Sequence, residues 1–119
     1  MSEEPTGEPT TVSTHILDTS RGRPAAGVTV RLETRPDPDQ PWSRLASGET
    51  NQDGRCAGLP PLPAGTTHAR LSFETATHLS GAGTPFFPEV TVAFAVDPGE
   101  HYHVPLLLNP YGYSVYRGS

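Results

Sequence analysis

Two histidines one residue apart, His101 and His103 in the segment HYHVPLLL, have the most obvious chemical potential in the chain. On an extended strand, residues i and i+2 project from the same face, so the two imidazoles are expected to lie side by side. Two such rings can bind a metal ion, but a zinc site needs further ligands and no third one stands at a useful spacing. We therefore expect no metal site here.

The other candidate residues are each open to a structural interpretation. His15 lies in the middle of the predicted strand VSTHILD, where threonine or valine is more usual, and it fits a structural role as well as a functional one. Arg55 follows the turn signal NQDG, where an arginine is usually just solvated, and Cys56 fits a small buried side chain. His68 and His78 are expected at the solvated surface. The chain has no Gly-x-Ser-x-Gly, Gly-rich phosphate loop or HExxH motif.

Alternating apolar and polar residues, the pattern of half-buried strands, recur along most of the chain. The clearest examples are residues 27–35, 67–74, 88–96 and 101–108. Clusters of Gly, Pro and Asp separate them, and only residues 74–83 resemble a helix, which the glycines at its end would stop. We therefore predict an all-β fold, an antiparallel β-sandwich of seven to eight strands with one short helix.

The length of 119 residues suits one domain with a core that needs no metal or disulfide. Residues 1–11 are acidic, contain two prolines and have no aromatic side chain. A segment of this kind cannot bury enough apolar surface to fold. We predict a disordered acidic lead-in over residues 1–11 and a sandwich domain over residues 12–119.

Composition argues against several classes of function. The net charge is −5, which does not fit the basic patch of a nucleic-acid-binding protein. No apolar run is long enough to span a membrane, and Met1–Thr11 does not resemble a signal peptide. The single cysteine, Cys56, cannot form an intramolecular disulfide, which fits a reducing compartment. We expect a cytoplasmic protein.

The outward faces of two predicted strands are unusual for plain exposure to solvent. The outer positions are half polar in residues 101–107 and mostly small in residues 89–95. Such faces suit a surface that a second subunit or a ligand approaches closely.

Three segments together resemble the transthyretin-like 5-hydroxyisourate hydrolases. They are THILDTSRGRPAAGVTVRLE, TNQDGR, and the stretch from FFPEVTVAFAV to HYHVPLLLNPYGYSVYRGS, so the resemblance extends from about Ser13 to Ser119. PYGYS is similar to the same stretch of transthyretin, the thyroid-hormone carrier of this fold, whereas the terminal YRGS and the histidines are typical of the hydrolase. The chain departs from the pattern at Asn109, where serine is common, and in the LPPLPAG and THLSGAG stretches.

The resemblance implies a transthyretin-like (prealbumin-like) sandwich and an enzyme of urate degradation in purine metabolism. Such an enzyme opens 5-hydroxyisourate at a cyclic amide bond and gives 2-oxo-4-hydroxy-4-carboxy-5-ureidoimidazoline. Members of the family are homotetramers, dimers of dimers, with their active sites in the channel between the dimers. The resemblance implies no metal or organic cofactor.

The motif positions of the family map residue by residue onto this chain. The expected catalytic residues are His15, Arg55, His103 and Ser119, and the expected substrate-binding residues are Tyr116, Arg117 and Gly118. Addition of water to an amide needs a base that is neutral near pH 7, so His103 is expected to take the proton of water and His15 to orient it or share that role. The order of the two histidines stays open. Arg55 is expected to bind the substrate and stabilise developing negative charge, and Ser119 to position water or substrate.

Two other functions remain in competition with hydrolysis. A small-molecule carrier of the same fold needs apolar channel walls, which His15, Arg55, His103 and Arg117 would make polar and charged. A structural β-sandwich module of the kind appended to secreted enzymes rarely occurs alone without a signal peptide.

Overall fold

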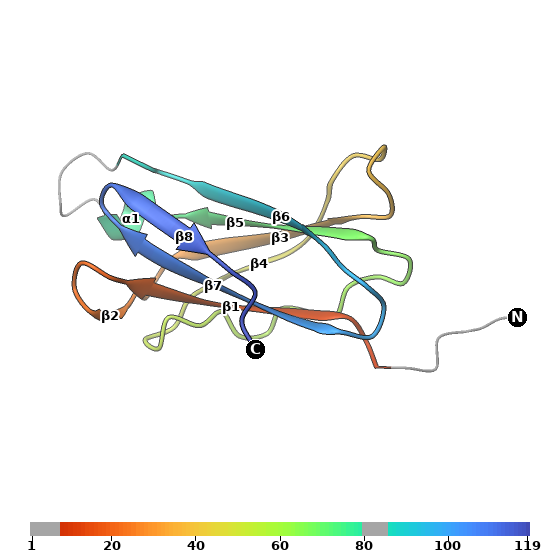
Figure 1. Ribbon diagram of the computed structural model, residues 1–119, viewed down its shortest axis with the longest axis horizontal. Helices are drawn as coiled ribbons and strands as arrows, with labels where there is room; N and C mark the ends of the chain where they lie inside the picture. Colours follow the sequence, from red (N-terminus) through yellow and green to blue (C-terminus); the bar gives the residue numbers. More distant parts are fainter. Residues whose placement is uncertain (1–7, 80–85) are drawn as a thin grey trace, which may run out of the picture.

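The computed structural model describes residues 8–79 and 86–119, and its strands form two four-stranded sheets packed against each other (Figure 1). Sheet A has the strand order β2-β1-β7-β8 and sheet B the order β4-β3-β5-β6. The elements are β1 (Thr11–Asp18), β2 (Arg23–Pro24), β3 (Thr29–Arg35), β4 (Ser43–Glu49), β5 (His68–Glu74), α1 (Ala76–Leu79), β6 (Val90–Ala95), β7 (His101–Asn109) and β8 (Gly112–Val115). The predicted all-β sandwich with one short helix is confirmed.

The core between the sheets is built by the inward positions of the alternating strands. Ile16 of β1, Leu32 of β3, Phe73 of β5 and Leu106 of β7 have no exposed surface. Each fully buried side chain of this size contributes roughly 1.5–3 kcal/mol to folding. The period-two pattern therefore holds the strands in a register that sends the alternate side chains outward.

The two long central strands of sheet A, β1 and β7, run parallel, whereas the other strand pairs of the described residues are antiparallel. Their register places Ser13 beside His103 and His15 beside Pro105. Segments far apart in the sequence thus contribute neighbouring side chains to the outer face of sheet A.

The two outer faces that the sequence singled out lie on different sides of the sandwich. Residues 101–107 belong to β7 in sheet A, whereas residues 90–95 belong to β6 in sheet B. In the described part of the chain, β6 and β8 are also the last strands of their sheets, so each has an edge without a neighbour.

Part of the predicted organisation lies outside the described residues. This holds for residues 1–7 of the lead-in and residues 80–83 of the predicted helix. The extent of the lead-in stays a prediction, although Thr11 begins β1 and its backbone N–H donates to the carbonyl of Glu100 at 3.1 Å. In residues 8–79 and 86–119, no helix has the length and apolar character needed to cross a membrane.

Candidate active site

A chain of hydrogen bonds connects four polar side chains on the outer face of β1 and β7. Thr11 Oγ1 lies 2.6 Å from Nδ1 of His101. Ser13 Oγ lies 2.9 Å from Nε2 of the same ring and 2.8 Å from Nδ1 of His103. The parallel register sets Thr11 beside His101 and Ser13 beside His103, which makes these contacts possible. The His-x-His pair therefore shares one face, as predicted, and a serine bridges its two rings.

His15 and Arg55 adjoin this chain on the same sheet. His15 is the next outward residue of β1 after Ser13, and an antiparallel bridge joins it to Arg55 at the other side of the strand. The backbone N–H of Ile16 donates to the carbonyl of Gly54 at 2.8 Å, which holds residues 54–55 against β1. Two residues 40 positions apart in the sequence are thereby neighbours.

The turn NQDG is the local reason that Arg55 reaches β1. The side-chain oxygen of Asn51 accepts hydrogen bonds from the backbone N–H groups of Asp53 and Arg55, at 2.9 and 3.1 Å. Gly54 has a φ of 76°, and a Cβ at this position would lie 2.4 Å from the carbonyl oxygen of Ile16. Only glycine fits a left-handed conformation at so close an approach.

The C-terminal segment lies against His103 from the opposite side. The backbone N–H of Gly118 donates to the carbonyl of His103 at 2.7 Å, and the bridge between them is in register with the β7–β8 pairing. A Cβ at Gly118 would lie 2.8 Å from Cδ2 of His103 and 3.2 Å from Cγ of Pro105. The chain thus touches the His103 ring here, with exposed Ser119 as the next residue.

Arg117 contacts a core side chain and the backbone of β7, and the described contacts of its side chain include none of the histidine rings. Its guanidinium carbon is 4.4 Å from the ring centroid of Tyr102, which is a core residue. Its Nη2 donates to Oε1 of Glu100 at 3.2 Å and to the carbonyl of His101 at 3.3 Å. Four of the seven site residues expected from the motifs come together, namely His15, Arg55, His103 and Gly118. Arg117 anchors the terminal segment at the edge of the sheet, and Tyr116 and Ser119 are exposed.

Burial lowers the pKa of His103 below that of an ordinary histidine, and the positive charge of Arg55 acts in the same direction. His15 and His101 contribute to the lowering as well. A neutral imidazole is therefore favoured at neutral pH, which is the form that can accept a proton. In the described residues, no group of three or more His, Cys, Asp or Glu side chains is placed to hold a metal ion.

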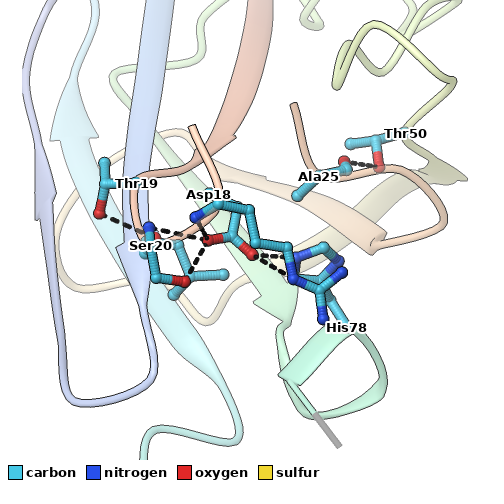
Figure 2. Close-up of polar contacts among 8 residues, drawn as sticks. Asp18, Thr19, Ser20, Ala25, Thr50 and His78 are labelled. Carbon is cyan, nitrogen blue, oxygen red and sulfur yellow. Dashed lines mark hydrogen bonds and ion pairs between the residues drawn. The ribbon is translucent and has the colours of Figure 1, made fainter. Parts of the chain in front are cut away.

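His78 is a correction to the sequence analysis, which expected it at the solvated surface. Its side chain is only 11% exposed, and its Nε2 lies 2.7 Å from Oδ2 of buried Asp18 (Figure 2). Burial raises the pKa of Asp18, but hydrogen bonds from Ser20, His78 and the Arg21 backbone outweigh it, so the pKa lies below its usual value. The pair joins α1 to the end of β1 and is part of the scaffold. His68 is half-buried, with its Nδ1 2.8 Å from the hydroxyl of Thr67.

Ser13 and Thr11 are polar partners that sequence reasoning missed. Both occupy outward positions on β1, two and four residues before His15. The period-two pattern contains that information, but their contact with the histidines depends on the parallel pairing of β1 with β7.

The family model described as the HIUase/Transthyretin family matches residues 12–118. The chain is 46% identical over 111 residues to a 5-hydroxyisourate hydrolase from Salmonella dublin, and the match covers 91% of this chain and 80% of that protein. The solved 5-hydroxyisourate hydrolase from Klebsiella pneumoniae is 41% identical, with a TM-score of 0.72 and coverage of 91% of this chain and 98% of that one. Transthyretin from Sparus aurata has a TM-score of 0.79 at 30% identity, over 90% and 95% of the two chains.

Proposed function

The chain belongs to the HIUase/Transthyretin family, and we propose that it hydrolyses 5-hydroxyisourate on the outer face of sheet A. The product is 2-oxo-4-hydroxy-4-carboxy-5-ureidoimidazoline, which makes the protein a hydrolase of urate degradation. One observation carries the assignment to this face: His15, Arg55 and Gly118 lie around His103. A neutral base, a cation and backbone groups are thereby gathered at one place.

In the proposed mechanism, His103 takes a proton from water. Ser13 occupies Nδ1, and in the described residues no hydrogen bond engages Nε2, which is the nitrogen that faces water in this proposal. As the proton moves to Nε2, the water oxygen bonds to the amide carbon and the carbonyl electron pair moves onto its oxygen. The tetrahedral species then collapses, the ring C–N bond breaks, and the proton on His103 passes to the leaving nitrogen. His15 orients the water or shares the proton.

Arg55 is proposed to bind the substrate and stabilise the oxyanion. Its side chain is exposed on the strand edge next to His15, and the Asn51 turn fixes its backbone. A guanidinium offers paired donors to the carbonyl oxygens of an electron-rich ring. One well-placed donor to an oxyanion is worth about a hundred- to a thousandfold in rate.

The terminal residues Tyr116, Arg117, Gly118 and Ser119 are proposed to complete the site. Gly118 allows the terminal segment to approach the His103 ring, and the hydroxyl of Ser119, the next residue, is proposed to position water or substrate there. Tyr116 is 53% exposed and free to contact a ligand or a second subunit. Arg117 contributes in this chain by holding the segment to Glu100 and Tyr102.

A homotetramer, a dimer of dimers, is the proposed assembly. The free edges of β6 and β8 allow a second copy to continue each sheet, since an unpaired strand edge is a template for pairing. Tyr111, Tyr113 and Tyr116 are large exposed side chains in or beside β8, which is typical of a surface that a partner covers. We further propose a cytoplasmic location, because the single cysteine, Cys56, is a free thiol.

A carrier of apolar ligands would need different side chains on the same face of sheet A. A pocket for apolar ligands needs mostly apolar walls with few polar groups. Here most outward positions of β1 and β7 are polar, namely Thr11, Ser13, His15, His101 and His103, whereas the neighbouring pair Leu17 and Leu107 is apolar. An apolar ligand on this face would separate the remaining polar groups, such as Nε2 of His103, from water without offering them a hydrogen bond.

The direct test generates 5-hydroxyisourate in place from urate with urate oxidase and follows the decay of its absorbance. We expect the protein to accelerate the decay in proportion to its concentration. Decay at the spontaneous rate would contradict the proposed function and favour the carrier.

A further inference from the structure

We propose that Ser13 and His101 are positioning residues that decide which nitrogen of the His103 ring acts as the base, an inference that rests on the proposed hydrolysis. The site residues expected from the sequence include neither of them. Ser13 Oγ lies 2.8 Å from Nδ1 of His103 and 2.9 Å from Nε2 of His101, and Nδ1 of His101 lies 2.6 Å from Oγ1 of Thr11. All three distances are those of good hydrogen bonds.

The single hydrogen of the Ser13 hydroxyl couples the two rings. A serine hydroxyl donates one hydrogen bond, and a neutral imidazole donates through one nitrogen and accepts through the other. When Ser13 donates to Nε2 of His101, it has to accept from Nδ1–H of His103. When Ser13 donates to Nδ1 of His103 instead, it has to accept from Nε2–H of His101. The two neutral rings therefore share one tautomer, both protonated on Nδ1 or both on Nε2.

Only the Nδ1–H state leaves His103 a free lone pair. In that state Nδ1 donates to Ser13, and among the described residues no hydrogen bond engages Nε2. In the Nε2–H state the lone pair of the neutral ring is on Nδ1, where it accepts the Ser13 hydroxyl. The proposed reaction therefore requires the Nδ1–H state, in which His101 accepts the hydrogen of Ser13.

This state persists through a turnover without any movement of hydrogens between the two rings. Nε2 of His103 takes a proton from water and passes it to the leaving ring nitrogen, so the ring ends neutral with its original proton on Nδ1. Nδ1–H donates to Ser13 in the neutral ring and in the imidazolium alike. The new carboxylic acid ionises to the surrounding water, since its pKa lies far below 7. Ser13 and His101 thus orient the base and transfer no proton themselves.

Protonation of His101 has the opposite effect on the neutral His103 ring. An imidazolium donates through both of its nitrogens, so Nε2–H of a charged His101 donates to Ser13. The Ser13 hydroxyl then has to donate to Nδ1 of His103, which places the proton of that ring on Nε2. Position 101 therefore supports the reaction only while its side chain accepts a hydrogen bond.

The surroundings of His101 allow other side chains at this position. The ring is exposed, and the groups that bond to its two nitrogens are uncharged hydroxyls. Glu100 and Arg117 pair with each other at 3.2 Å, and Arg117 donates to the carbonyl of His101. Among the described residues, the charged or titratable groups next to the two rings are Arg55, His15, Glu100 and Arg117.

Two variants of His101 fix the direction of the Ser13 hydroxyl. His101→Glu supplies a carboxylate, which only accepts, so Ser13 donates to it and His103 keeps its Nδ1–H. His101→Lys supplies an ammonium, which only donates, so His103 is driven to the Nε2–H state. At about pH 8 we expect kcat of the glutamate variant within about threefold of wild type. We expect kcat of the lysine variant to fall about tenfold or more, the population change that one hydrogen bond to a charged group produces.

Charge alone predicts the opposite order of these two variants. A cation near His103 lowers its pKa and a carboxylate raises it, so lysine would keep the ring neutral over a wider range of pH. The acidic limb of the pH–rate profile therefore reports the charge at position 101, whereas the plateau above it reports the tautomer. Ser47→Glu and Ser47→Lys, on the exposed surface of sheet B, carry the same charges and should match wild type in both.

Removal of the Ser13 hydroxyl tests the coupling itself. Ser13→Ala should lower kcat about two- to tenfold, the effect of one hydrogen bond, and Ser13→Thr should restore it. In the Ser13→Ala background, the glutamate and lysine variants of His101 should reach the same plateau. Ser47→Ala is the matched control. A plateau difference that persists without the hydroxyl, or equal plateaus in its presence, would overturn the proposal.

The ring tautomers provide a readout that needs no turnover. Nitrogen-15 NMR of the free protein at about pH 8, where ordinary histidines are neutral, reports which nitrogen of each ring carries the proton. We expect Nδ1–H on both rings of the wild-type protein, and Nε2–H on His103 in the His101→Lys variant. Different tautomers on the two wild-type rings would overturn the coupling. Failure of the wild-type protein to accelerate the decay would instead contradict the proposed function.

Discussion

Replacement of Gly118 by alanine places one methyl group where the terminal segment touches the proposed base. The added Cβ would lie 2.8 Å from Cδ2 of His103, and 3.2 and 3.3 Å from Cγ and Cδ of Pro105. The proline ring is rigid, so the strain must move either the His103 ring or the terminal segment.

The size of the displacement follows from ordinary carbon contacts. Such contacts begin at about 3.4 Å, so ring and segment must separate by roughly 0.6 Å. A misplacement of about 1 Å costs roughly a hundredfold in rate, and catalytic groups need to be held within about 0.5 Å. We therefore expect kcat/KM to fall by about ten- to a hundredfold, with a free energy of unfolding within about 1 kcal/mol of wild type.

The assay compares initial rates of 5-hydroxyisourate decay, with urea unfolding and light scattering on the same samples. Gly112→Ala is the matched control, because a Cβ there would meet only the side chain of Asn109 at 3.7 and 3.8 Å. It should retain wild-type rates within about threefold. A Gly118→Ala enzyme with unchanged kcat and KM would refute the claim that the terminal segment sets the position of His103.

Further variants test the electrostatics and the scaffold. Burial and then Arg55 lower the pKa of His103, so Arg55→Ala should raise it and move the acidic limb of the pH–rate profile to higher pH. The same variant also lacks the guanidinium that donates to the oxyanion, so its kcat should fall about a hundredfold, measured by stopped flow across pH. The lowered pKa of Asp18 contributes stability that is complete above the ordinary carboxyl pKa and is lost as pH falls through the lowered value. Asp18→Asn should therefore cost about 2–4 kcal/mol at pH 7 and flatten the acid limb of unfolding, measured in urea between pH 3 and 7. His78→Ala should cost about 1–2 kcal/mol in the same measurement while kcat per folded enzyme stays unchanged.

Period-two alternation was enough to predict which side chains of β3, β5 and β7 face the core. Val28, Val30 and Leu32 are fully buried, as their spacing indicated. In the terminal segment, the structure places Arg117 against Tyr102, whereas Gly118 lies against the His103 ring. The sequence motifs place both residues in the substrate-binding group.

Alternation does not reveal which strands become neighbours. The contacts of Ser13 and His78 were not predicted because each depends on segments that are distant in the sequence. Ser13 reaches His103 only because β1 pairs in parallel with β7, a contact between residues 90 positions apart. His78 is buried by its contact with Asp18, 60 residues away, although its local sequence is that of a short exposed helix. Such long-range contacts leave no local pattern for sequence reasoning to detect.

The most direct test of a His103-dependent hydrolase is the decay of 5-hydroxyisourate with wild-type protein and His103→Ala side by side. His68→Ala is a suitable control, since His68 lies on sheet B with its Nδ1 near Thr67. We predict strong acceleration by the wild-type and His68→Ala proteins, and a loss of about two orders of magnitude or more in His103→Ala with an intact fold. Full activity of a folded His103→Ala protein would contradict the proposed site.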